Sequence, residues 1–119
     1  MCGVATILVL DNDPAMTELM RTLLEDQGHT AIIATSLDRV PVDARPDLVL
    51  SDLMPLKGYR PDQARAWVAS VRARFDSPVI VVTGHAGAAA EQDKLGAEAV
   101  ITKPFDLDQL IALVSGHLR

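Results

Sequence analysis

Four short polar groups follow aliphatic runs of this sequence, and their residue types could do chemistry together. The first run, "ILVL", is followed by Asp11, Asn12 and Asp13. Later runs are followed by Ser51 and Asp52, by Thr83 and Gly84, and by Thr102 and Lys103. Carboxylate oxygens are ligands that Mg²⁺ prefers, and a lysine ammonium binds phosphate oxygens as a compact charge. Carboxylates, a hydroxyl and an ammonium at one place therefore suit a divalent cation and a phosphoryl group.

The aliphatic runs have the pattern of strands that are buried on both faces. They are rich in Val, Ile and Leu without polar alternation, and they cover residues 7–10, 31–34, 48–50, 79–82 and 100–101. Helical periodicity separates them, and this alternation predicts an α/β fold with a parallel five-stranded sheet covered on both sides. Ligands of such sheets bind beyond the carboxyl ends of the strands, where the polar groups stand.

The first and last helices have the clearest boundaries. Asp13 is an expected N-cap, with Pro14 at the first helical position and Gly28 placed to end the helix. Its apolar stripe comprises Met16, Leu19, Met20, Leu23 and Leu24. Asp106 and Gln109 resemble a capping box at the start of the last helix. The stripe of that helix comprises Leu107, Leu110, Ile111, Val114 and Leu118.

The three middle helices are less regular. Residues 36–43 contain Pro41, which predicts a short or broken helix. The next helix begins near Pro61, and its apolar positions are Ala64, Trp67, Val68, Val71 and Phe75. Residues 87–95 are rich in alanine, so we expect a fourth helix that packs shallowly.

Length and composition favour one domain over residues 1–119. Hydrophobic residues make up 49% and charged residues 23%, which is typical of a globular chain with one core. The net charge of -5 argues against direct nucleic-acid binding. The single cysteine, Cys2, excludes an internal disulfide and favours a reducing compartment. The first apolar run is too short for a membrane span and has no basic leader, so we expect a cytoplasmic protein.

Four segments together resemble the receiver domains of two-component response regulators. They are "ILVLDNDP", "PDLVLSDLMP", "PVIVVTGHAG" and "GAEAVITKPF", which stand in the family's order and near its spacing. The resemblance covers nearly the whole chain. It implies a flavodoxin-like (βα)5 fold, a doubly wound sheet with strand order 2-1-3-4-5.

The resemblance also implies a role for individual residues. Asp52 matches the phosphoacceptor, which takes a phosphoryl group from a histidine kinase or a phosphotransfer protein. Asp11 and Asn12 match the pair that holds Mg²⁺ together with Asp52 and a backbone carbonyl two residues on, at Met54. Thr83 and Lys103 match the hydroxyl and the ammonium that bind the phosphoryl oxygens. By the same resemblance, a downstream protein or output domain would dock on the fourth helix, the fifth strand and the fifth helix.

Three departures make this an atypical member of the family. Asn12 replaces the second acid, which predicts weaker Mg²⁺ binding. "DLMPLKG" is shorter than the family's loop after the phosphoacceptor, which argues against Met54 as a ligand. Val100 stands three positions before Lys103, where the family often has an aromatic switch residue. Together these changes leave open a degenerate pseudo-receiver that binds proteins without phosphorylation.

Other interpretations of the same residues remain open at this point. Asp13 serves as a helix cap or as a metal ligand, Thr83 as a cap of the fourth helix, and Lys103 as a structural countercharge. "DNDPA" resembles the start of haloacid-dehalogenase-like phosphatases, a third function in which Asp11 is the nucleophile. The pattern of four motifs favours the phosphoacceptor, a signalling module rather than an enzyme with turnover.

Overall fold

One parallel sheet of five strands forms the centre of the protein. The computed structural model describes residues 5–53, 60–90, 95–103 and 105–118. The strand order is β2-β1-β3-β4-β5, which confirms the predicted doubly wound topology. The strands are β1 (Thr6–Leu10), β2 (Thr30–Ala34), β3 (Leu48–Ser51), β4 (Val79–Thr83) and β5 (Ala99–Thr102).

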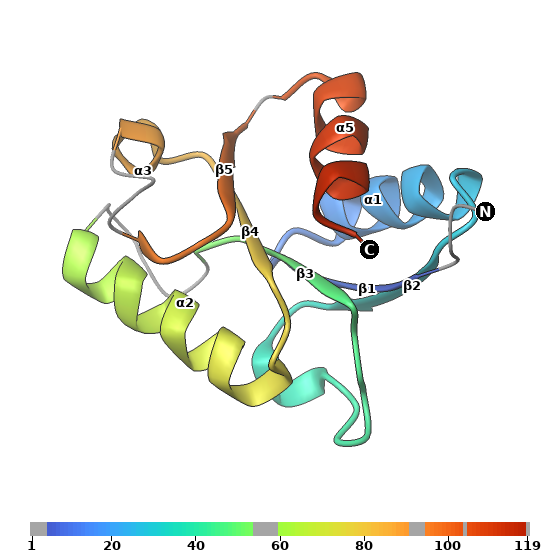
Figure 1. Ribbon diagram of the computed structural model, residues 1–119, viewed down its shortest axis with the longest axis horizontal. Coiled ribbons are helices and arrows are strands. Elements are labelled where there is room, and N and C mark those ends of the chain that lie inside the picture. The colour runs from blue at the N-terminus through green and yellow to red at the C-terminus, as the bar shows by residue number, and fades with distance from the viewer. Residues whose placement is uncertain (1–4, 54–59, 91–94, 104, 119) are drawn as a thin grey trace.

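Two layers of helices cover the sheet (Figure 1). Helices α1 (Pro14–Asp26) and α5 (Leu107–His117) pack on one face. The opposite face carries α2 (Pro61–Phe75), α3 (Ala86–Ala90) and the 3-10 turn η1 (Leu37–Arg39). Alternate residues of each strand face opposite sides, so the core has two halves. Leu50, for example, packs toward α1 and α5, whereas Val49 packs toward α2.

Local signals set the helix ends. Asp13 Oδ1 accepts a hydrogen bond from Ala15 N–H at 3.0 Å, so Asp13 is the N-cap that the sequence predicts for α1. Gly28 follows the end of α1 with a φ of 86°, which favours glycine. Asp106 caps α5 through Asp108 N–H at 2.8 Å. Sequence reasoning therefore placed both termini of α1 and the start of α5 correctly.

The other helix expectations have mixed outcomes. The short or broken helix that the sequence predicts over residues 36–43 is confirmed as the single 3-10 turn η1, because Pro41 cannot donate the backbone hydrogen bond that would continue it. The expected fourth helix, over residues 87–95, falls partly outside the described residues, and its described part is α3. Leu19 and Leu107 do not join the buried stripes, since 45% and 41% of these residues remain exposed. Within the described ranges, no helix is long and apolar enough to cross a membrane.

Strand register aligns the polar groups at one edge. Leu10 pairs with Ser51, and Ser51 pairs with Val81. Thr83 pairs with Thr102. The residues that follow β1, β3, β4 and β5 therefore emerge side by side at the carboxyl edge of the sheet, as the sequence predicts.

Candidate functional site

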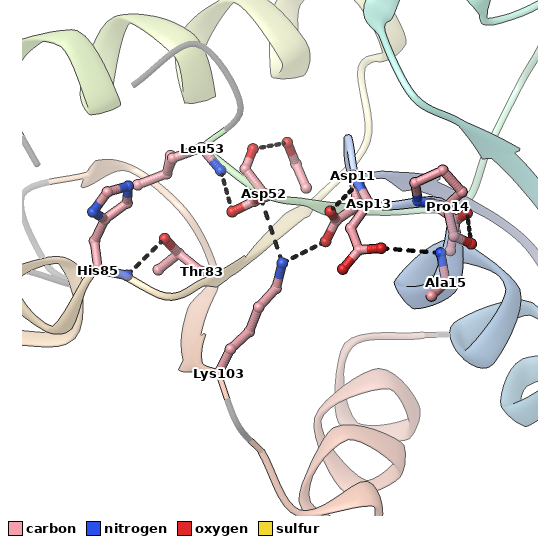
Figure 2. Close-up of polar contacts among 11 residues, drawn as sticks. Asp11, Asp13, Pro14, Ala15, Asp52, Leu53, Thr83, His85 and Lys103 are labelled. Atoms are coloured by element: carbon pink, nitrogen blue, oxygen red, sulfur yellow. Dashed lines mark hydrogen bonds and ion pairs between the residues drawn. The ribbon is translucent and has the colours of Figure 1, made fainter. Parts of the chain in front are cut away.

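Lys103 brings two acidic side chains together at the carboxyl edge of the sheet (Figure 2). Its Nζ lies 2.6 Å from Asp11 Oδ2 and 3.5 Å from Asp52 Oδ2. The backbone holds Lys103 in place, because its N–H donates to Thr83 O at 2.7 Å. Asp52 N–H likewise donates to Leu10 O at 2.8 Å. Asp11 and Asp52 follow neighbouring strands, and β4 separates Asp52 from Lys103, so the long side chain of Lys103 reaches back across the edge of the sheet to both acids.

Asp11 is a buried carboxylate with a partner for each oxygen. Only 1% of the residue is exposed. Its Oδ1 accepts a hydrogen bond from Asp13 N–H at 2.9 Å, and its Oδ2 accepts one from Lys103 Nζ at 2.6 Å. A buried charge is tolerated when it is paired and hydrogen-bonded in this way. Lys103 thus acts as a countercharge to Asp11, whatever else it binds.

Asp52 is partly buried and has its two oxygens in different surroundings. Oδ1 accepts a hydrogen bond from Leu53 N–H at 2.8 Å, whereas Oδ2 faces Lys103 Nζ at 3.5 Å. Burial raises the pKa of the Asp52 carboxyl above its usual value. The charge of Lys103 opposes this effect, and the charge of Asp11 adds to it. The raised pKa makes Asp52 a more basic carboxylate than an exposed aspartate.

Thr83 and His85 lie beside Asp52 (Figure 2). Thr83 is fully buried, and its Oγ1 accepts a hydrogen bond from His85 N–H at 3.1 Å. This hydrogen bond therefore stabilises the turn between β4 and α3. Since α3 begins at Ala86, its N-cap position falls on His85 and not on Thr83. In strand order Asp52 stands between Asp11 and Thr83, so a group on Asp52 would have Thr83 on one side and Asp11 on the other.

The donors available for Mg²⁺ are the carboxylates of Asp11 and Asp52. Hard oxygen atoms of this kind fit the ion. Asn12 is exposed, and Asp13 uses Oδ1 to cap α1. Met54 lies outside the described residues. Among the residues that the structure describes, no three His, Cys, Asp or Glu side chains form a group that could hold a metal. The chemistry of the donors fits Mg²⁺, but the ion would have to compete with Lys103 for Asp11 Oδ2.

Two further residues reach the site from the face that α2 covers. Ser51 is fully buried, and its Oγ donates a hydrogen bond to Asp52 O at 2.8 Å. Trp67 on α2 donates from Nε1 to Ser51 Oγ at 2.9 Å. The sequence placed Trp67 among the apolar positions of its helix and Ser51 among the polar groups after the strands, without linking the two. A buried indole N–H needs an acceptor, and this was the only signal for the contact.

A cavity of about 690 Å³ lies at the opposite edge of the sheet. Its lining residues precede the strands or lie near the C-terminal ends of α2 and α5, and they include Asp47, Arg72, Glu98 and His117. Arg72 and Glu98 form an ion pair there, with Nη1 2.6 Å from Oε1. Burial alone would raise the pKa of Glu98, but hydrogen bonds from Arg72 and Val79 N–H outweigh burial and lower it. Arg72 and Glu98 therefore pair with each other at this cavity, and neither charge calls for a ligand.

Comparison with protein families and curated proteins gives one consistent result. A family model described as the response regulator receiver domain matches residues 7–115. The nitrogen assimilation regulatory protein NtrX of Azorhizobium caulinodans is 31% identical over 118 residues, which are 95% of this chain and 26% of that protein. The transcriptional regulatory protein CpxR of Escherichia coli is 32% identical over 120 residues, which are 95% of this chain and 49% of that protein. The chain spans about a quarter to a half of the length of these two relatives.

Solved structures of response regulators also superpose on this chain. The structure of NtrX from Brucella abortus superposes with a TM-score of 0.80 at 30% identity, and the match covers 98% of this chain and 27% of that one. A response regulator from Thermotoga maritima superposes with a TM-score of 0.75 at 24% identity, over 96% of this chain and 97% of that one. The second likeness supports the fold alone.

Proposed function

Because this chain belongs to the response regulator receiver domains, we propose that it accepts a phosphoryl group on Asp52 and signals through a changed surface. Receiver domains of two-component systems are signalling phosphoacceptors rather than ordinary enzymes. The observation that carries the proposal is the position of Asp52 Oδ2. This oxygen lies 3.5 Å from Lys103 Nζ, and the same Nζ contacts the buried Asp11. A nucleophilic oxygen with a cation and a second acid beside it allows the positioning and charge neutralisation on which phosphoryl transfer depends.

In the proposed reaction, Asp52 Oδ2 attacks the phosphorus atom of a phosphohistidine or of a small acyl phosphate. An oxygen–phosphorus bond forms, the bond from phosphorus to the donor's nitrogen or oxygen breaks, and the donor leaves with the electron pair. Lys103 moves from Asp11 toward the transferred group and neutralises its oxygens. The Thr83 hydroxyl, which accepts a hydrogen bond from His85 N–H, gives up that contact and donates its proton in a hydrogen bond to a phosphoryl oxygen. This exchange changes the turn before α3.

Receiver domains generally bind Mg²⁺ at their acidic site, and Asp11 and Asp52 would hold it here. When bound, the ion supplies further positive charge to the phosphoryl oxygens. Asn12 contributes at most an amide oxygen, and Lys103 already occupies Asp11 Oδ2 at 2.6 Å. Mg²⁺ binding is therefore expected to be weaker than with a second acid at position 12.

Receiver domains interact with histidine kinases and with output domains. We propose a histidine kinase or a phosphotransfer protein as the donor. The proposed docking surface for a downstream protein or output domain comprises α3, β5 and α5, because the turn at Thr83 leads directly into α3. Val100 has no aromatic ring to move behind Thr83, so the change at Thr83 would reach this surface by another route than an aromatic switch. A protein with these partners is expected to work in the cytoplasm.

The experiment that tests the proposal is phosphorylation by acetyl phosphate with Mg²⁺, followed by mass spectrometry of the peptides. The peptide that contains Asp52 should gain one phosphoryl group, and Asp52→Asn should abolish the gain. Asp47→Asn is a matched control, since Asp47 precedes β3 whereas Asp52 follows it. A gain that persists in Asp52→Asn would refute the assignment.

A pseudo-receiver that does not accept phosphate is the second candidate. Both oxygens of Asp11 already have partners within the protein, and Asn12 is exposed. This function predicts neither phosphorylation nor measurable Mg²⁺ affinity, together with unchanged partner binding in Asp52→Asn. The phosphatase alternative gains no support, because Asp13 caps α1 and Asp11 is paired with Lys103.

A further inference from the structure

We infer that Ser51 and Trp67 are positioning residues that select Oδ2 of Asp52 as the nucleophile. They act through a chain of hydrogen bonds that runs from α2 to the peptide group between Asp52 and Leu53. The inference rests on the proposed phosphoryl transfer and adds a second set of residues to it, on the face of the sheet opposite α1 and α5.

The chain has two links of ordinary length. Trp67 Nε1 donates to Ser51 Oγ at 2.9 Å, and Ser51 Oγ donates to Asp52 O at 2.8 Å. Ser51 is fully buried at the end of β3, so water does not compete for its hydroxyl. Trp67 is partly buried and packs against the core on the same face. Hydrogen bonds in such surroundings strengthen one another and fix geometry.

Trp67 fixes the direction of the chain. An indole N–H is a donor only, whereas a serine hydroxyl can rotate and has one proton to give. Since Trp67 uses one lone pair of Ser51 Oγ, the serine proton must point elsewhere, and Asp52 O lies within reach. Without the indole, the hydroxyl could turn away from Asp52.

The carbonyl of Asp52 and the N–H of Leu53 belong to one planar peptide group. In a trans peptide these two bonds point in opposite directions, so fixing the oxygen also fixes the N–H. The Leu53 N–H donates to Asp52 Oδ1 at 2.8 Å. Ser51 therefore fixes the peptide plane through the carbonyl of Asp52. The N–H of Leu53, at the other side of the same plane, fixes Oδ1 of Asp52.

This arrangement makes the two oxygens of Asp52 unequal. Oδ1 is tied to its own backbone, and Oδ2 is left facing Lys103 Nζ at 3.5 Å. The carboxylate cannot rotate without losing the bond from Leu53 N–H. Ser51 and Trp67 thus aim the reactive oxygen at the place where the phosphoryl group and its counterions meet, as positioning in phosphoryl transfer requires.

The test compares Trp67→Phe, Ser51→Ala and the double variant with the unmodified protein. Ser70→Ala is the matched control, because Ser70 lies on the exposed side of α2 and its hydroxyl donates to Ala66 O within the same helix. Under saturating acetyl phosphate and Mg²⁺, each single variant should lose about threefold to tenfold in the limiting rate of Asp52 phosphorylation, the range that one hydrogen bond supports. The half-saturating concentration of acetyl phosphate should stay unchanged. The double variant should be no slower than Ser51→Ala, since Trp67 acts through Ser51.

A second readout does not depend on phosphorylation. Hydrogen exchange of the Leu53 amide, followed by NMR, should be faster in both single variants, because the bond from Leu53 N–H to Asp52 Oδ1 is loosened. If Ser51→Ala does not fold, Trp67→Phe alone carries both measurements.

Unchanged rates and unchanged hydrogen exchange of the Leu53 amide in Trp67→Phe, relative to Ser70→Ala, would overturn the inference. If the unmodified protein accepts no phosphoryl group, the proposed function fails. The positioning role in catalysis then falls with it, and hydrogen exchange of the Leu53 amide decides whether Trp67 and Ser51 orient the carboxylate.

Discussion

Replacing Lys103 with methionine should remove the charge that two acids share. Methionine keeps much of the length and apolar volume of the lysine stem but has no ammonium. Asp11 would lose a partner at 2.6 Å and Asp52 one at 3.5 Å. The two carboxylates would then repel each other without compensation. Lys103→Met is therefore expected to destabilise the fold and to change how the site responds to Mg²⁺.

The expected loss in the free energy of unfolding depends on how deeply the ion pair of Lys103 and Asp11 is buried. Removing one partner of a fully buried ion pair costs about 3–5 kcal/mol. Lys103 keeps 21% of its side chain exposed, so water can enter the site when the ammonium is removed. Asp11 also retains its hydrogen bond from Asp13 N–H, and both effects reduce the loss of stability. We expect a loss of about 2 kcal/mol in the free energy of unfolding, or a fall of about 8 °C in Tm.

Urea unfolding at pH 7, with and without Mg²⁺, measures both effects. Mg²⁺ should stabilise Lys103→Met more than the unmodified protein, because Asp11 Oδ2 is released to the ion. The control is Arg21→Met, which breaks an exposed pair with Glu18 and should cost about 0–1 kcal/mol. Adding Asp11→Asn to Lys103→Met should recover stability, since it removes the unpaired charge. A loss no larger than that of Arg21→Met, together with equal Mg²⁺ effects, would refute the reasoning.

Three other perturbations test separate parts of the site. Asp13→Ala should lower the free energy of unfolding by about 1 kcal/mol through loss of the α1 cap, measured by urea titration, with Mg²⁺ affinity unchanged. Asn12→Asp should tighten Mg²⁺ binding in calorimetry, and an equal or weaker affinity would show that residue 12 does not limit the site. Asp52→Asn should be more stable than the unmodified protein at pH 7, because burial raises the pKa of Asp52 and penalises its ionised form. That advantage should shrink as the pH falls through the raised pKa and end near pH ~4, where the unfolded chain also binds the proton; a constant difference across this range would count against the raised pKa.

Much of the fold was predictable because local and long-range signals agree. Five aliphatic runs without polar alternation gave the buried strands, and Asp13, Pro14 and Gly28 gave the boundaries of α1. The meeting of Asp11, Asp52 and Lys103 followed from the rule that polar residues after parallel strands share one edge. These features depend on residue type and chain order, which the sequence carries directly.

Other features depend on side-chain geometry that a pattern does not encode. The sequence places Lys103 near both acids but does not reveal that it lies closer to Asp11 than to Asp52. The contact between Trp67 and Ser51 joins residues 16 positions apart and depends on how α2 lies on the sheet. Leu19 and Leu107 fit the helical stripes, yet they stay largely exposed. Periodicity defines which face of a helix is apolar, but not how far the sheet beneath it extends.

The central claim is that Asp52 binds a phosphoryl group beside Lys103 with the help of Mg²⁺. Beryllofluoride adopts the tetrahedral shape of a phosphoryl group on a carboxylate oxygen, and its bound fluorides can be observed by ¹⁹F NMR. The account predicts a bound signal that requires Mg²⁺, disappears in Asp52→Asn and weakens in Lys103→Met. A bound signal that survives in Asp52→Asn, or no bound signal in the unmodified protein at saturating Mg²⁺, would contradict it.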